Sequence, residues 1–128
     1  MIKINELRIG NIVEYNGFHL PVYSIIGTYP NEDCRYNDKA RVDLVCDGFI
    51  TANEDEINPI PVTPELLTKC GFKIDQYGDY NLDSICFAML NGMVFDVMFP
   101  NIAYNLQYLH QLQNLYYMTH NVEMEVKL

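Results

Sequence analysis

The sequence contains no long hydrophobic run: nowhere in its 128 residues do apolar side chains continue for the roughly eighteen positions that a membrane-spanning helix needs. The N-terminal stretch Met1 to Glu6 also lacks the charged and then apolar layout of a secretion signal. We therefore expect a cytoplasmic protein that has no membrane among its partners.

Metal-ligand and disulfide patterns are absent as well. The four cysteines, Cys34, Cys46, Cys70 and Cys86, are widely spaced, and no C-x-x-C pair or accompanying histidine completes a zinc site. Each lies within or beside an apolar stretch, which favours buried, reduced thiols over disulfides in a cytoplasmic protein. The three histidines are equally scattered. The sequence therefore predicts neither a metal site nor a cofactor.

Positive charge is scarce. Eight basic residues against seventeen acidic ones give a formal net charge of −9, which repels phosphate backbones and disfavours direct nucleic-acid binding. A basic partner, or plain solubility, is consistent with such a charge. The densest acidic cluster, Asn53-Glu54-Asp55-Glu56, is too short for an acidic tail and is typical of a solvated loop.

Catalytic signatures are missing too. The chain has no G-x-G-x-x-G and no G-x-x-x-x-G-K-[ST] phosphate loop, and its glycines fall mainly at predicted turns and caps. Ser24 and Ser84 lie in strand-like runs without the glycines of a nucleophile elbow. No local pattern pairs a cysteine with a histidine base. We therefore predict no catalytic residue.

The N-terminal part is rich in strand and turn signals. A β-branched and aromatic run over 7–15 meets Asn16-Gly17, the strongest short hairpin signal, and a second strand-like run follows over 18–26. Pro21 lies inside this second run and predicts an edge position or a bulge, because proline cannot donate to a sheet ladder. The segment from Gly27 to Lys39 is predicted to be a long surface loop.

A second hairpin, an extended segment and a short helix come next. Residues 41–46 alternate in polarity, and Asp47-Gly48 turns the chain into a strand over 49–52. Two prolines make the strap over 57–62 extended, because proline pushes the residue before it away from helical geometry. Thr63-Pro64-Glu65 then provides an N-cap, a first-turn proline and an acidic first turn for a short helix over about 64–70.

The C-terminal part combines a hairpin, a helix and a strand. Strand-like runs over 80–90 and 93–99 flank Asn91-Gly92 and predict a hairpin. Apolar residues then recur every three to four positions and predict a longer helix over about 105–119, with Asn121 as a left-handed stop. Residues 122–128 alternate again, which predicts a C-terminal strand.

These elements together predict an α+β fold: mainly antiparallel sheet, or a partly open small barrel made from several hairpins, with one short and one longer helix. We expect a single domain over 1–128, since this length supports one core. Within it, 1–56 is hairpin-rich, 57–62 is the extended strap, and 63–128 holds helix, hairpin, helix and strand.

Three stretches resemble a known group of proteins: Leu7-Arg8-Ile9-Gly10-Asn11, Pro59-Ile60-Pro61-Val62-Thr63 and Leu109-His110-Gln111-Leu112-Gln113-Asn114-Leu115-Tyr116. They are similar to signature stretches of an uncharacterised family of small proteins from gut-bacterial phages, prophages and mobile elements. The most specific part is the His-Gln-Leu-Gln-Asn-Leu-Tyr stretch. The resemblance implies a bacterial host cell as the setting, and it transfers no reaction. The run over 8–13 is also similar to the opening of small SH3-like barrels.

The residues most suited to an interaction surface are tyrosines near predicted loops, the acidic loop, and the polar side of the longer helix. They are Tyr29, Tyr36, Glu54, Asp55, Glu56, Tyr77, His110, Gln111 and Asn114. Tyrosine is enriched in interfaces, and imidazole and amide groups both donate and accept hydrogen bonds. The helix residues could equally fix the helix in register, and the tyrosines could equally lie in the core or at its rim.

The leading hypothesis is a non-enzymatic protein-interaction module of phage or mobile-element origin, with an unidentified protein partner and with homo-oligomerisation left open. One alternative is a small hydrolase or ligand-binding enzyme whose site joins His110 with Cys46 or Cys86 and acidic residues in three dimensions. A further alternative is an acidic mimic of nucleic acid that blocks a defence protein.

Overall fold

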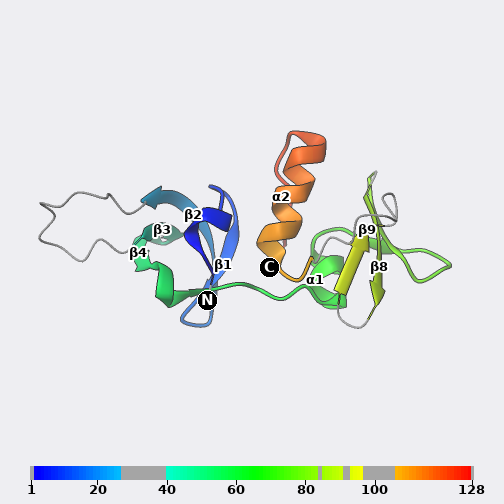
Figure 1. Cartoon of the computed structure of the whole chain (residues 1–128), viewed down its shortest axis with the longest axis horizontal. Helices are drawn as coiled ribbons and strands as arrows, with labels where there is room; N and C mark the ends of the chain where they lie inside the picture. The colour runs from blue at the N-terminus through cyan, green and yellow to red at the C-terminus, as the bar shows by residue number, and fades with distance from the viewer. Residues whose placement is uncertain (1, 27–39, 84, 91–92, 97–105, 128) are drawn as a thin grey trace, which may run out of the picture. The chain divides into compact units, whose positions relative to one another are not determined.

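The computed structural model describes residues 2–26, 40–83, 85–90, 93–96 and 106–127, and for 87–90 and 93–96 the backbone alone (Figure 1). The fold is α+β, as predicted, with mainly antiparallel sheet and two α-helices in the described part. The chain divides into two compact units, unit 1 over Met1–Ile60 and unit 2 over Pro61–Leu128. The division falls inside the predicted strap over 57–62, and the single domain stays a prediction.

Unit 1 is a five-stranded antiparallel meander whose last strand pairs with its first. Its elements are η1 (Ile4–Glu6), β1 (Ile12–Tyr15), β2 (Phe18–Ile26), β3 (Arg41–Cys46), β4 (Gly48–Asn53), η2 (Glu54–Glu56) and β5 (Ile57–Asn58). The strand order is β4-β3-β2-β1-β5. Because β2 pairs with β1 through its first half and with β3 through its second, the sheet curls into a half-barrel.

Both hairpins predicted in unit 1 are confirmed. Asn16 and Gly17 have positive φ angles of 49° and 84°, as the two-residue turn that best matches strand twist requires. The Gly17 N–H donates to Oε1 of Glu14 at 2.6 Å, which ties this turn to β1. At the second hairpin Cys46 pairs with Gly48 across the turn. The two turns fix the register of both hairpins.

Of the two alternatives predicted from Pro21, an edge position or a bulge, one is confirmed. The edge position is wrong, because β2 is an inner strand of the sheet. The bulge is present, since the pairing with β3 shifts register between Val22 and Ser24. Pro21 itself pairs with Ile12 of β1, and the ladder to β3 begins at the next residue. The missing N–H therefore falls where β2 has only one neighbouring ladder.

The core of unit 1 gathers inward side chains of its strands together with two from the N-terminal segment before β1. They are Ile2, Leu7, Val13, Val22, Val42, Leu44, Ala52 and Ile57. Asn11 is also fully buried, and its Oδ1 accepts the Arg8 N–H at 2.7 Å. Gly10 has a φ of 97°, which favours glycine. The Leu7–Asn11 stretch that carries the family resemblance thus has a structural role.

Unit 2 combines a four-stranded antiparallel meander with two α-helices in its described part. Its elements are α1 (Pro64–Lys69), β6 (Lys73–Ile74), β7 (Tyr80–Leu82), β8 (Ile85–Leu90), β9 (Met93–Asp96) and α2 (Leu109–His120). The hairpin expected around Asn91-Gly92 is confirmed in its flanking strands, since Leu90 pairs with Met93. No described helix is both long and apolar enough to cross a membrane.

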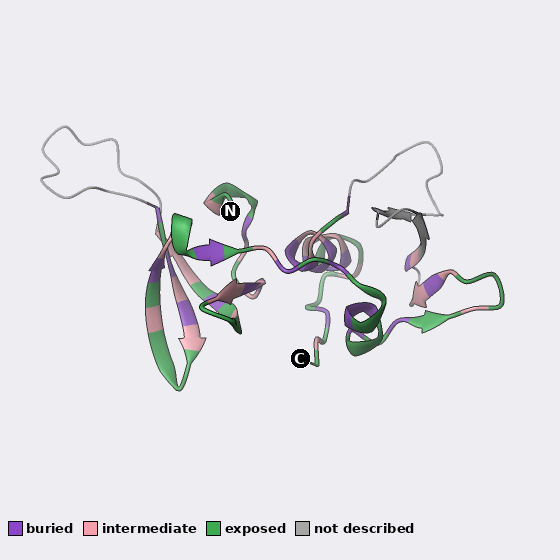
Figure 2. Ribbon diagram, turned by 90° about the horizontal axis from the view of Figure 1, so that it is seen from below, coloured by how far each residue is buried: buried purple, intermediate pink, exposed green. Residues whose placement is uncertain are grey.

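The short helix α1 forms where its capping signals predict. Thr63 Oγ1 accepts the Leu66 N–H at 3.2 Å, Pro64 occupies the first turn, and the helix ends at Lys69. Leu66 and Leu67 are buried while the rest of the helix is exposed, and Figure 2 shows the purple side of α1. Because six residues are too few for an independent helix, burial of this one face holds α1 in place.

The longer helix begins at Leu109, later than the predicted start near 105. The preceding residues are used for pairing instead: Tyr108 forms an isolated bridge with Pro61, and the Val62 N–H donates to the Gln107 carbonyl at 2.9 Å. The predicted stop is confirmed, since Asn121 has a left-handed φ of 56° and its N–H donates to the Tyr117 carbonyl. Tertiary pairing therefore overrides the helical period at the first turn.

The strand predicted over 122–128 is wrong in its described part, because residues 122–127 join no sheet. Burial still alternates, with Met124 buried between exposed glutamates. This C-terminal segment contacts the end of α1 instead of a strand, since the Lys127 N–H donates to the Lys69 carbonyl at 3.1 Å. An alternating sequence pattern indicates that one side of an extended segment is buried, and it does not indicate what covers that side.

Candidate functional site

An apolar hollow of unit 1 lies where two of its hairpin turns meet. We call it the mouth hollow; it has a volume of about 630 Å³ and is lined by Tyr15, Asn16, Phe18, Leu20, Cys46, Asp47 and Ile50. Strand alternation explains its walls. Val13 and Leu44 face the core, so Tyr15 and Cys46, two positions further along, face the same interior beyond the core's last layer.

The mouth hollow has aromatic and aliphatic walls and an acidic lip. Phe18 pairs directly with Tyr15 across β1 and β2, and its side chain is 66% exposed. Asp47 contributes the lip carboxylate, and no lysine, arginine or histidine is among the described residues that line the hollow. Such a site suits a group that is apolar along its length and positive at its tip.

A second feature of unit 1 is an exposed pair of aromatic rings, Tyr23 and Phe49, which we call the outer aromatic pair. Their ring centroids lie 4.6 Å apart at an interplanar angle of 41°. Tyr23 is 56% exposed and Phe49 62% exposed. The pair comes from β2 and β4, on the face opposite the core, because Phe49 pairs with the outward Val45. Two large rings held on a sheet face form a firm apolar surface.

Beside the outer aromatic pair runs a polar row that is internally satisfied. Ser24 Oγ donates to Asp43 Oδ2 at 2.6 Å, and Thr51 Oγ1 donates to Asp43 Oδ1 at 2.7 Å. These hydrogen bonds, the one from Ser24 first, lower the pKa of the Asp43 carboxyl. The row therefore stitches β2, β3 and β4 together.

Unit 2 has a hollow of similar size, about 570 Å³, which we call the unit 2 hollow. Its lining is Thr68, Lys69, Cys70, Gly71, Leu82, Asp83, Tyr116, Met124, Glu125 and Lys127. The Tyr116 hydroxyl donates to Asp83 Oδ2 at 2.8 Å, and this bond raises the pKa of Tyr116. Burial raises the pKa of the Cys70 thiol to about 11. The hollow therefore holds a neutral thiol and an occupied carboxylate.

A small carboxylate and thiol cluster lies in the β6–β7–β8 region. Ligand atoms of Asp75, Asp79 and Cys86 all lie within 4.8 Å of one another. The Asp75 carboxylate, however, already accepts the N–H groups of Tyr77 and Asp79 and the Asn81 amide. These bonds, led by the one from Asn81, lower the pKa of Asp75. The Asp75 carboxylate therefore stabilises the loop between β6 and β7 through these hydrogen bonds.

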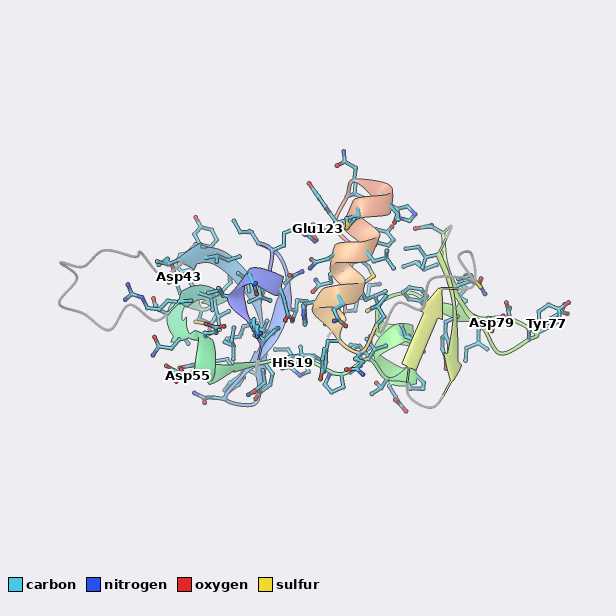
Figure 3. All side chains as sticks on the ribbon, in the orientation of Figure 1. His19, Asp43, Asp55, Tyr77, Asp79 and Glu123 are labelled. Atoms are coloured by element: carbon cyan, nitrogen blue, oxygen red, sulfur yellow. The ribbon has the colours of Figure 1, made fainter. Side chains whose placement is uncertain are left out.

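The predicted interaction residues fall into separate places. Tyr29 and Tyr36 lie outside the described residues. Glu54, Asp55 and Glu56 form η2 in unit 1, and the remaining residues belong to unit 2. Tyr77 is 78% exposed at the tip of the β6–β7 hairpin, where Figure 3 labels it beside Asp79.

Of the three predicted residues of α2, one is buried and two are half-buried. His110 is 1% exposed and its ring stacks on Tyr108, with centroids 5.9 Å apart. Gln111 and Asn114 are half-buried. Gln111 Oε1 accepts the N–H groups of Gln107 and Tyr108, which caps the helix start. The structural alternative considered for this polar side accounts for Gln111 directly.

The enzyme alternative required His110 to meet a cysteine and acidic groups. Among the described residues, the one metal-type cluster of histidine, cysteine and carboxylate groups does not include His110. Cys46 lies exposed in unit 1, whereas His110 lies buried in unit 2.

Comparisons with known proteins add no identity. No family model matches the chain, and neither a curated protein nor a solved structure does. The surfaces described above are therefore what a functional proposal has to rest on.

Proposed function

We propose that the chain is a protein-interaction module that binds its partner through unit 1. The observation that carries this proposal is the outer aromatic pair. Tyr23 and Phe49 are both more than half exposed, although aromatic side chains of this size are normally buried. Exposed aromatic rings on a rigid element are typical of interface centres.

Two further properties support an interaction role. The strands that present the pair are cross-linked by the Asp43 hydrogen bonds, so little side-chain and backbone freedom remains to be lost on binding. The strand order of unit 1, with a 3-10 turn before its last strand, is also what a small SH3-like barrel would have. Such barrels serve many binding functions, so the likeness suggests a class and not a ligand.

A hydrolase is less well supported. That alternative joins His110 with Cys46 or Cys86 and acidic residues, and among the described residues the cluster that holds Cys86 contains Asp75 and Asp79 but not His110. We propose a phage or mobile-element setting in a bacterial host on the family resemblance alone.

The test is affinity purification of the tagged full chain from a bacterial host of this setting. The wild type should recover a stoichiometric partner, and a Tyr23→Thr/Phe49→Thr double variant should lose it, because threonine suits a strand but removes both rings. Tyr77→Thr removes another exposed tyrosine and serves as the matched control. Recovery of the same partner by the double variant would contradict the proposal.

A further inference from the structure

We infer that the mouth hollow of unit 1 binds a cationic side chain, an arginine presented by a basic segment of a protein partner. The inference depends on the proposed interaction function only in that the bearer of the arginine is a protein. The mouth hollow and the outer aromatic pair are distinct sets of residues, so each can fail without the other.

The walls of the hollow fit the stem and the plane of an arginine. Leu20 and Ile50 supply aliphatic contact, and Tyr15 and Phe18 supply aromatic rings. Arginine packs its methylene groups along such surfaces and stacks its planar guanidinium on aromatic faces, which attract a cation through the ring quadrupole.

The lip of the hollow carries a carboxylate that the fold does not use. Other acidic groups of unit 1 accept hydrogen bonds inside it: Asp43 from two hydroxyls, and Glu14 from Gly17 and Asn58. No donor among the described residues contacts Asp47. A carboxylate beside an apolar hollow, without an internal partner, is placed to pair with an incoming cation.

The charge of the chain and of the hollow disfavours anionic ligands. With a net charge of −9 and no basic residue among the described residues of its lining, the hollow repels anions. A purely apolar side chain would desolvate the Asp47 carboxylate without giving it a partner, which costs free energy. A cation gains from both the rings and the carboxylate.

Nuclear magnetic resonance titration of the full chain with a short capped peptide, acetyl-Gly-Arg-Gly-amide, tests this directly. The matched probe contains citrulline, which has the shape of arginine without its charge. We expect the arginine peptide to shift the amide signals of Phe18, Asp47 and Ile50, and the citrulline peptide to bind about tenfold more weakly. Equal affinity for the two peptides, or no binding of either, would overturn the inference.

Two variants with equal net charge locate the contact. Asp47→Asn removes the lip charge but keeps the size and shape of the side chain, at a residue that does not have a positive φ. Asp55→Asn removes one charge from η2 of the same unit (Figure 3). We expect about fivefold weaker arginine binding for Asp47→Asn and less than about twofold for Asp55→Asn. Equal losses would mean attraction by net charge only and would refute the site.

The aromatic wall is tested by Phe18→Leu, with Phe49→Leu as the control on the outer face. Loss of one ring from the hollow should weaken arginine binding about threefold, and the control should leave it unchanged. Well-dispersed amide spectra of both variants exclude unfolding as the cause. If the Tyr23→Thr/Phe49→Thr variant loses its partner yet still binds the arginine peptide, this site stands, whereas loss of both by a well-folded variant rejects this site alone.

Discussion

The mouth hollow of unit 1 and the unit 2 hollow have nearly the same volume, about 630 Å³ and about 570 Å³, but their polar groups are used differently. In unit 2 the Asp83 carboxylate already accepts the Tyr116 hydroxyl at 2.8 Å. In unit 1 no described donor reaches Asp47. The volume of a hollow alone therefore does not indicate a binding site. A polar group in its lining that lacks a partner within the protein is a better indication.

The cysteines of the two hollows extend the comparison. Cys46 lines the mouth hollow and is exposed, whereas Cys70 lines the unit 2 hollow and is buried. Cys46 is therefore accessible to reagents in solution, whereas Cys70 is part of the interior. The unit 1 hollow is therefore open, whereas the unit 2 hollow is part of the structure.

The largest expected effect is on the helix that supports the unit 2 hollow. Leu112→Ala should lower the free energy of unfolding by about 2–5 kcal/mol, because Leu112 is fully buried and its truncation leaves a cavity. Met118→Ala, on the same helix but 81% exposed, should change it by less than about 0.5 kcal/mol. Urea denaturation measures both, and similar losses would show that burial in α2 does not stabilise the fold.

The thiols should differ by about two orders of magnitude in alkylation rate. The pKa of Cys70 is raised to about 11 from an ordinary value of 9.0, which reduces its thiolate fraction about a hundredfold at mildly alkaline pH. Cys46 is exposed and carries no such burial. Iodoacetamide labelling followed by peptide mass spectrometry should find Cys46 modified first, and comparable rates would remove the contrast between the hollows.

The Tyr116–Asp83 hydrogen bond should contribute about 1–2 kcal/mol. Tyr116→Phe removes the hydroxyl and should destabilise the protein by this amount, whereas Tyr77→Phe on an exposed tyrosine should have no effect. Since the folded-state pKa of Tyr116 is raised, the contribution is complete below about pH 10 and is lost as pH rises through the folded pKa. A stability difference that grows above pH 10 would contradict this assignment.

The smallest effect is expected at the lip of the mouth hollow. Asp47→Asn should change the free energy of unfolding by less than about 0.5 kcal/mol, because no described group depends on its charge. Asp83→Asn should cost about 1 kcal/mol, since it weakens the bond to Tyr116. Asparagine tolerates the left-handed φ of 53° at position 83, so backbone strain does not confuse the comparison. Thermal melts of the two variants, run side by side, decide it.

Local signals predicted much of the fold correctly. The Asn16-Gly17 turn, the Thr63-Pro64 helix start and the Asn121 stop each depend on the residues present at that point, and each is confirmed. The errors lie where distant segments decide. The first turn of the expected 105–119 helix is lost to a bridge with Pro61, and the last segment packs on the end of α1 instead of joining a sheet.

The mouth hollow was missed for the same reason. In the sequence Phe18 is a strand residue and Asp47 a turn residue, 29 positions apart. They line one hollow because β2 pairs with both β1 and β3, a long-range arrangement that no local pattern encodes. One signal was available: Tyr15 and Cys46 continue the inward alternation of Val13 and Leu44 along β1 and β3.

The residues of the helix stretch that carries the family resemblance illustrate the limit of polarity as a guide. His110 and Gln113 are polar but buried, and Gln111 caps its own helix. Gln111 therefore has the structural role that the alternative anticipated, while the interaction role of His110 and Asn114 stays a prediction.

One titration tests the central claim that the unit 1 hollow binds ligand and the unit 2 hollow does not. With acetyl-Gly-Arg-Gly-amide added to the full chain, both hollows are observed in the same amide spectrum. The account predicts saturable shifts at Phe18, Asp47 and Ile50, with Leu82, Asp83 and Tyr116 unmoved. Saturable shifts confined to the unit 2 residues, or shifts at neither hollow, would contradict it.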